Sequence, residues 1–91
     1  MKTKERQENK DLAMMSDPSK WPYWPWLPMK RYVAEGQEMA VLHADAFADQ
    51  PNPLYKVNLF AIKTYFPTEE MEKTQVYKNF DAMLVDGWKV D

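Results

Sequence analysis

Eight residues, Trp21-Pro22-Tyr23-Trp24-Pro25-Trp26-Leu27-Pro28, constrain the fold of this chain more than any other stretch. They hold three of its four tryptophans and three of its seven prolines. Proline fixes φ near −65° and biases the preceding residue towards extended geometry, so this Trp/Pro segment cannot be helical and is expected to be polyproline-like or irregular. Each large aromatic carries on the order of 150–250 Å² to bury. Because soluble monomers rarely expose so large an apolar patch, the segment must lie against something.

Two placements of the Trp/Pro segment remain open from the sequence. It straps across the sheet of its own domain and closes the core, or it offers an aromatic surface to a protein partner or to stacked bases. Both hold at once if only some of the tryptophans turn inward. The aromatic and cationic residues of this segment and of the run that follows are the interface candidates: Trp21, Tyr23, Trp24, Trp26, Lys30, Arg31 and Tyr32.

Length and composition predict a single small domain. The chain has 91 residues, of which 45% are apolar and 14% aromatic, enough for a genuine core. A domain of this size buries only about 60% of the surface of its unfolded chain, so a homodimer would add useful burial. Residues 1–17 are mostly charged and are expected to form a flexible tail with at most a short helical turn. Residues 18–91 are expected to form the domain.

Cysteine content and charge narrow the class of protein. Without cysteine there is no disulfide framework and no thiolate metal site, which argues for a reducing compartment. The first residues lead into further charge rather than an apolar signal sequence, and no apolar run approaches the ~18 residues that span a bilayer. We therefore expect a cytoplasmic protein without a membrane partner. The net charge of −2 is far from that of a basic nucleic-acid-binding domain.

The middle of the chain carries the strand patterns. Residues 29–34 and 38–44 flank Glu35-Gly36-Gln37 and predict a hairpin whose turn uses Gly36. Residues 54–62 show the strongest strand pattern and predict a central strand. Its alternation sets Tyr55, Val57 and Leu59 against Lys56 and Asn58, while Phe60 and Ile62 fall on the polar side and suggest a strand covered on both faces.

The last third of the chain admits two interpretations. One helix could cover residues 75–86, or Thr74–Tyr77 could be a strand followed by a short helix over 80–86 capped by Asn79. We prefer the second, because asparagine is a strong N-cap and Thr, Val and Tyr favour strands. In both, Gly87 is a C′ glycine and the final residues form a short closing strand. The predicted fold class is α+β: an antiparallel sheet of three to five strands, one short C-terminal helix on one face, and the Trp/Pro segment strapped across.

No catalytic apparatus is recognisable. The single histidine, His43, falls in a predicted strand and is interpreted as a half-buried structural residue. Ser16 and Ser19 are the only serines and lie in the entry segment, so a nucleophilic triad is not expected. Two isolated glycines cannot form a phosphate-binding loop, and a metal site would depend on carboxylates that we interpret as solvated. We therefore expect no enzyme, no metal site and no cofactor.

Three functions are ranked from these observations. The favoured one is a small non-catalytic protein-interaction module, accessory or self-associating, because the residue types enriched in interface cores concentrate between positions 21 and 32. Its partner is an unidentified protein or a second copy. The alternative is single-stranded nucleic-acid binding by stacking on Trp and Tyr beside Lys20, Lys30 and Arg31. A small enzyme ranks last. Size and composition also suit an accessory protein of a phage or mobile element, although no motif supports this.

Overall fold

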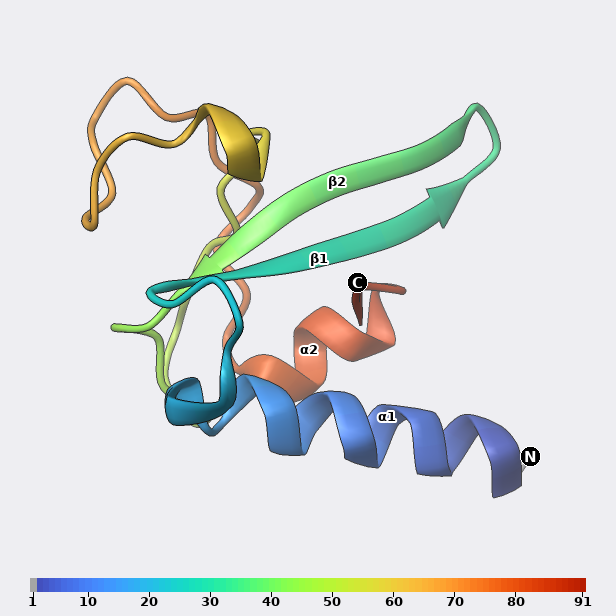
Figure 1. Ribbon diagram of the computed structural model, residues 1–91. Helices are drawn as coiled ribbons and strands as arrows, with labels where there is room; N and C mark the ends of the chain where they lie inside the picture. The colour runs from blue at the N-terminus through green and yellow to red at the C-terminus, as the bar shows by residue number, and fades with distance from the viewer. Residues whose placement is uncertain (1) are drawn as a thin grey trace.

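The computed structural model describes the backbone of residues 2–91 and the side chains from Asn9 onward. Three strands form one antiparallel sheet in the order β2-β1-β3. Both α-helices lie on the same side of this sheet (Figure 1). The predicted α+β class with an antiparallel sheet and a short C-terminal helix is therefore confirmed. In chain order, the elements are α1 (Lys2–Met15), the 3₁₀ turn η1 (Pro18–Lys20), β1 (Trp26–Val33), β2 (Gly36–His43), the 3₁₀ turn η2 (Leu59–Ala61), α2 (Phe80–Val85) and β3 (Lys89–Val90).

The hairpin of β1 and β2 is the frame on which the rest is built. The two strands are joined by a two-residue turn, and Gly36 follows it with a φ of 137° that favours glycine, so the predicted hairpin is confirmed. Pro28 is accommodated inside β1 because its partner Val41 directs its own N–H and C=O towards Tyr55, away from β1. The missing N–H of Pro28 is therefore not needed in the β1–β2 ladder.

The Trp/Pro segment differs from the predicted strap. Its first half makes two successive turns, in which the N–H of Trp24 donates to Trp21 O (3.3 Å) and that of Trp26 to Tyr23 O (3.0 Å). The peptide bond between Trp24 and Pro25 is cis. Its second half is the beginning of β1 itself. Because successive strand residues point to opposite faces, Trp26 and Leu27 are buried on the two sides of the sheet without any strap.

The core lies between the helices and one face of the sheet. Leu27 and Met29 of β1 and Ala40 and Leu42 of β2 point to this face and are fully buried. Trp88, the largest fully buried side chain, follows α2 and closes the core. The members of the core cluster are Met15, Trp21, Leu27, Met29, Ala40, Leu42, Leu54, Tyr77, Phe80, Met83, Leu84 and Trp88.

The N-terminal segment is a helix where the sequence predicts at most a short helical turn. α1 packs against α2 and β3, and Met15 at its end is fully buried. Trp21 donates its indole N–H to Met14 O (2.6 Å), which fixes the end of the helix. The apolar cluster at 12–15 therefore holds the segment to the core. Met1 lies outside the described residues, and the predicted flexibility of residues 1–17 and the boundary after them stay predictions.

The predicted central strand over 54–62 is wrong. Within it only Tyr55 pairs, with Val41 on one side and Lys73 on the other. The N–H of Lys56 then donates to Glu72 O (2.7 Å), which turns the chain away from β2. The Asn58 side chain accepts from the N–H of Phe60 (3.0 Å) and begins η2. Local capping and pairing with the returning chain thus override the period-two pattern.

The preferred interpretation of the C-terminal third is largely confirmed. Asn79 Oδ1 accepts from the N–H of Ala82 (2.8 Å) and caps α2. Gly87 follows with a φ of 97°, and β3 pairs antiparallel with β1. Residues 74–77 are the exception: they do not form a strand, and Tyr77 makes only an isolated bridge with Asn52.

Candidate interaction surface

The tryptophans and the tyrosine of the Trp/Pro segment are divided between core and surface. Trp21 and Trp26 are buried, whereas Tyr23 is half exposed and 57% of Trp24 is exposed. The turns before β1 point Tyr23 and Trp24 outward, and the first residue of β1 points inward. Of these four interface candidates, two therefore remain available to a partner.

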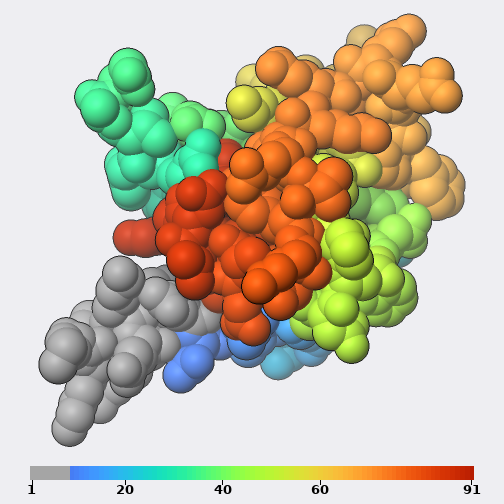
Figure 2. Space-filling model, turned by 180° about the vertical axis from the view of Figure 1, so that it is seen from behind, coloured from blue at the N-terminus to red at the C-terminus, as the bar shows by residue number. Residues whose placement is uncertain are grey.

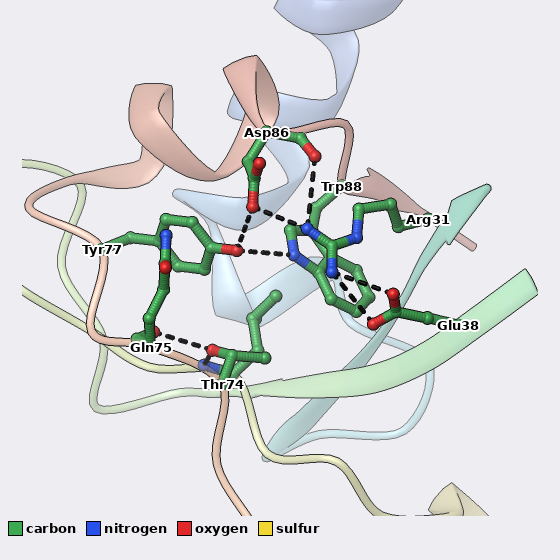
Figure 3. Close-up of polar contacts among 8 residues, drawn as sticks. Arg31, Glu38, Thr74, Gln75, Tyr77, Asp86 and Trp88 are labelled. Carbon is green, nitrogen blue, oxygen red and sulfur yellow. Dashed lines mark hydrogen bonds and ion pairs between the residues drawn. The ribbon is translucent and has the colours of Figure 1, made fainter. Parts of the chain in front are cut away.

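Arg31 lies in a polar cluster that joins the hairpin to the C-terminal elements (Figure 3). Its Nη2 donates to both carboxylate oxygens of Glu38 (3.0 Å each), and its Nη1 donates to Asp86 Oδ2 (2.6 Å). The guanidinium carbon lies 4.8 Å from the ring centroid of Trp88. Burial lowers the pKa of Arg31, but the hydrogen bond and charge of Glu38 outweigh it, so the pKa is raised overall. The Arg31 guanidinium is thus engaged in contacts within the fold.

Tyr77 completes the same cluster (Figure 3). Its hydroxyl donates to Asp86 Oδ2 (2.5 Å) and accepts from Trp88 Nε1 (3.0 Å). Burial raises the pKa of the Tyr77 phenol above its ordinary value of 10.0, and the hydrogen bond to Asp86 acts in the same direction. Gly87 packs against the Arg31 side chain of this cluster, because a Cβ atom at Gly87 would lie 3.4 Å from Arg31 Cγ.

The two remaining candidates lie apart from Tyr23 and Trp24. Lys30 Nζ is 3.4 Å from Asp91 Oδ1, so this cation is paired. Tyr32 is exposed next to the hairpin turn, with Lys89 Nζ 5.9 Å from its ring centroid. Neither residue lines the hollows around Tyr23 and Trp24. The fold therefore does not bring Lys30, Arg31 and Tyr32 together with the exposed aromatics of the Trp/Pro segment.

The most exposed aromatics come instead from loop 56–72, the excursion between Tyr55 and Lys73. Its ends meet, because Tyr55 bridges Lys73 and the N–H of Lys56 donates to Glu72 O. No side chain of this loop is buried. Figure 2 shows the loop, in yellow and orange, and the tip of the hairpin, in blue-green, as two separate projections. The aromatic residues of loop 56–72 are Phe60, Tyr65 and Phe66, which are 84%, 67% and 66% exposed.

Two buried residues of the hairpin hold loop 56–72 in place. Trp26 donates its indole N–H to Thr64 O (3.0 Å), and His43 donates its Nε2–H to Tyr65 O (2.7 Å). Trp26 and His43 are register partners in β1 and β2, so the two tethers come from one place on the sheet. The loop backbone is thereby fixed while its aromatic side chains point outward.

His43 is more deeply buried than the sequence suggests, with 5% of its surface exposed. Its Nδ1 accepts the N–H of Asp45 (3.1 Å), so Nε2 carries the proton that it donates to Tyr65 O. Both ring nitrogens are engaged in holding the backbone. The histidine therefore positions the loop.

Four exposed side chains from the two segments line one hollow and form what we call the aromatic surface: Tyr23, Trp24, Phe60 and Tyr65. Phe66 is exposed as well, but its ring lies beside that of His43, with centroids 6.0 Å apart. The rings of Tyr23 and Phe60 meet edge to face with centroids 6.2 Å apart. On one side of this pair, a hollow of about 360 Å³ is lined by Trp24, Tyr65 and Lys63. On the other side, a groove of about 700 Å³ runs towards β2. Tyr23 and Phe60 therefore form a ridge between two hollows.

The loop half of the aromatic surface was missed from the sequence. The sequence pattern places Phe60 in a doubly covered strand, because Phe60 falls on the polar side of the 54–59 alternation. That break in the pattern was the available signal, since a change of side at Phe60 and Ile62 also fits a chain that has left the sheet. Tyr65 and Phe66, directly before Pro67, mark the same departure.

Among the side chains that the structure describes, no three or more His, Cys, Asp or Glu residues gather where they could hold a metal ion. Over residues 2–91, no helix combines the length and apolar character needed to cross a membrane. Comparisons with protein-family models, curated proteins and solved structures found no match to this chain.

Proposed function

We propose that this protein is a small non-catalytic interaction module that binds a protein partner through the aromatic surface. The observation that carries the proposal is that exposed aromatic side chains from two distant segments meet on one tethered surface. Tyrosine, tryptophan and phenylalanine are the residues enriched in interface cores and among hot spots. A cytoplasmic location, expected from the lack of cysteine, is part of this proposal.

The energetics of the loop support a binding role. A fully buried large apolar side chain contributes about 1.5–3 kcal/mol, and the exposed aromatics of loop 56–72 do not make this contribution to folding. Burial against a partner would recover it. Because Trp26 and His43 fix the loop backbone, little conformational entropy would be lost on binding.

Single-stranded nucleic acid is the second candidate, and one observation favours it. Lys63 lines the hollow beside Trp24 and Tyr65, which brings a cation next to two rings on which bases could stack. The cations that the sequence groups with the tryptophans do not add to this, since Arg31, Lys30 and Lys20 are each in an ion pair. We rank this candidate below protein binding because Lys63 and, in the neighbouring groove, Lys56 give little phosphate neutralisation.

The test compares two double variants of the tagged full chain, each purified gently from its native host. Trp24→Ser/Phe60→Ser, the ridge variant, removes the exposed tryptophan and the Phe60 half of the ridge. Val76→Ser/Val85→Ser removes exposed apolar residues near α2 as a matched control. We expect a co-purifying protein, identified by mass spectrometry, to be lost only from the first variant. Circular dichroism should show both variants folded.

Size exclusion with light scattering and absorbance separates the outcomes. Absorbance at 260 nm that co-elutes with the wild type, is removed by nuclease and is absent from Trp24→Ser/Phe60→Ser would favour the nucleic-acid candidate. Equal partner recovery by the wild type and the ridge variant would contradict the proposed use of the aromatic surface. A twofold mass that the ridge variant loses would identify the partner as a second copy.

A further inference from the structure

We propose that the partner contributes an extended peptide segment that adds to the outer edge of β2 as a fourth strand, and this inference rests on the proposed function. The segment would lie in the groove between β2 and the start of loop 56–72 and place an apolar side chain in it. Strand addition to an open sheet edge is a recurrent mode of peptide recognition, in which backbone bonds give affinity and pockets give specificity.

The outer edge of β2 has backbone groups without a partner strand. Val41 exchanges both of its backbone hydrogen bonds with Tyr55 (2.8 and 2.9 Å), so its N–H and C=O point away from β1. Alternate residues of a strand direct these groups to the same edge, so those of Met39 and Gln37 point outward too. In the part of the chain that the structure describes, Tyr55 is the only residue that bridges this edge. The half of β2 towards the hairpin turn is therefore an open edge.

The chain itself places one residue in the position of a fourth strand and then turns away from β2. Tyr55 lies beside Val41, in the row that a fourth strand would occupy. At the next residue the chain is drawn away, because the N–H of Lys56 donates to Glu72 O. Beyond this point the tip of the hairpin projects away from loop 56–72 and from the helices (Figure 1). A peptide beside Met39 and Gln37 would continue the row that Tyr55 starts.

The groove of about 700 Å³ lies along this open edge and is mainly apolar. Met39, Val41 and Pro28 contribute from the outer face of the sheet, and Val57 and Phe60 contribute from the loop. Every second side chain of an added strand would point to this outer face. The groove is therefore placed to receive an apolar side chain of such a strand.

The charge of the groove indicates what else the peptide carries. Lys56 lines the groove, is exposed, and has no ion pair among the described side chains. The other charged lining residue, Asp91, is already paired with Lys30 at 3.4 Å. Lys56 is thus the unpaired charged side chain of the groove among the described residues, which favours an acidic residue in the peptide beside it.

A second copy of the chain fits this edge less well than a peptide. Tyr55 leaves only the short stretch around Gln37 and Met39 for mutual antiparallel pairing. Pairing that uses both residues sets the Glu38 residues of the two copies opposite each other. Each Glu38 is already bonded to its own Arg31, so this contact adds no charge attraction between the copies. We therefore commit to an extended apolar and acidic segment of another protein.

The test selects short random displayed peptides on the folded full chain and measures binding of the synthesised winners by fluorescence polarisation. We expect winners with alternating apolar residues and an Asp or Glu. Met39→Pro removes an N–H that faces away from β1, so it should weaken binding about tenfold, whereas Met39→Ala keeps that N–H and should bind better than Met39→Pro. Lys56→Glu should weaken binding of acidic winners about two- to fivefold.

Amide hydrogen exchange decides the geometry even if Met39→Pro does not fold. In the wild-type complex, exchange at Gln37 and Met39 should slow at least about tenfold, because both N–H groups gain an acceptor. Winners that bind without slowing these amides, or a selection without winners, would overturn the fourth strand. The proposed function survives either result if Trp24→Ser/Phe60→Ser still loses the cellular partner. A dimer that protects the same amides in the free protein would replace the peptide with a second copy.

Discussion

Trp24 and Trp26 are two positions apart, yet one is exposed and the other is buried. Trp26 is the first residue of β1, and its register with His43 places it under loop 56–72. Trp24 precedes the strand in a turn, and 57% of it is exposed. Both are tryptophans next to prolines, so residue type cannot distinguish them. Their different exposure follows from the position at which β1 begins, because Trp26 is its first residue and Trp24 precedes it.

The burial of the tryptophans predicts their fluorescence. Trp21, Trp26 and Trp88 are buried, and Trp24 alone of the four is exposed. Trp24→Phe should therefore shift the emission maximum to shorter wavelength and remove most quenching by acrylamide. Trp88→Phe, as control, should leave the quenchable component in place. Strong remaining quenching in Trp24→Phe would show that another tryptophan is accessible to solvent.

Tyr77 predicts how stability depends on pH at the alkaline end. Its phenol keeps its proton in the folded protein above the pH of about 10.0 at which the unfolded chain releases it. The unfolded state then binds fewer protons than the folded state, so the free energy of unfolding falls as pH rises through this range. Below about pH 10 the contribution of Tyr77 is fully present.

Tyr77→Phe should lower stability at about pH 8 by on the order of 1–3 kcal/mol, because Trp88 Nε1 is left without its acceptor. From there to about pH 11, the variant should lose less stability than the wild type. Urea unfolding followed by fluorescence measures both. The exposed Tyr32→Phe should decline in parallel with the wild type. Equal slopes for Tyr77→Phe and the wild type would refute the assignment.

At the scale of elements, the hairpin organises both the core and the surface. One face of β1 and β2 carries core residues, while the other carries Trp26 and His43, which hold loop 56–72. The strand register that buries the core thus also sets where the loop is tethered. The position of the aromatic surface is a consequence of the hairpin.

Removal of one tether should loosen the loop without unfolding the protein. Trp26→Phe keeps an aromatic ring but loses the N–H that donates to Thr64 O. A net hydrogen bond of about 1 kcal/mol corresponds to about fivefold faster opening. We expect amide exchange in residues 60–68 to rise by about that factor in mass-spectrometric measurements. Trp21→Phe, which loses the bond to Met14 O, should instead affect the end of α1. An increase spread over all elements would contradict a local tether.

Elements with local signals were predictable from the sequence, and those set by distant pairing were not. Gly36 at the hairpin turn and Asn79 at the α2 cap act within a few residues, and both were identified. The 54–62 segment has an equally strong local pattern, but its path depends on the bond from Lys56 to Glu72 across the loop. Half of the aromatic surface was predicted, through Tyr23 and Trp24. The other half lies in the loop that this bond closes, and its one signal in the sequence is the break in the alternation at Phe60 and Ile62.

At the scale of the whole molecule, stability and the aromatic surface depend on different residues. Phe80 is fully buried, whereas Phe60, Tyr65 and Phe66 make up the exposed aromatics of the loop. Phe60→Ser/Tyr65→Ser/Phe66→Ser should therefore change the free energy of unfolding by no more than about 0.5 kcal/mol per site. Phe80→Ala should cost about 3–5 kcal/mol. Urea denaturation compares the two. A triple variant as unstable as Phe80→Ala would show that the loop belongs to the core.

Loop 56–72 has no fully buried side chain, so folding constrains only some of its residues, such as Asn58 at the start of η2. Mutations that would be lost from a core residue because they unfold the protein can persist in this loop. Its tethers are held by Thr64 and Tyr65 through backbone carbonyls, which every residue type carries. Natural variation or laboratory evolution could therefore rewrite the aromatic residues for a new target while the scaffold is inherited unchanged.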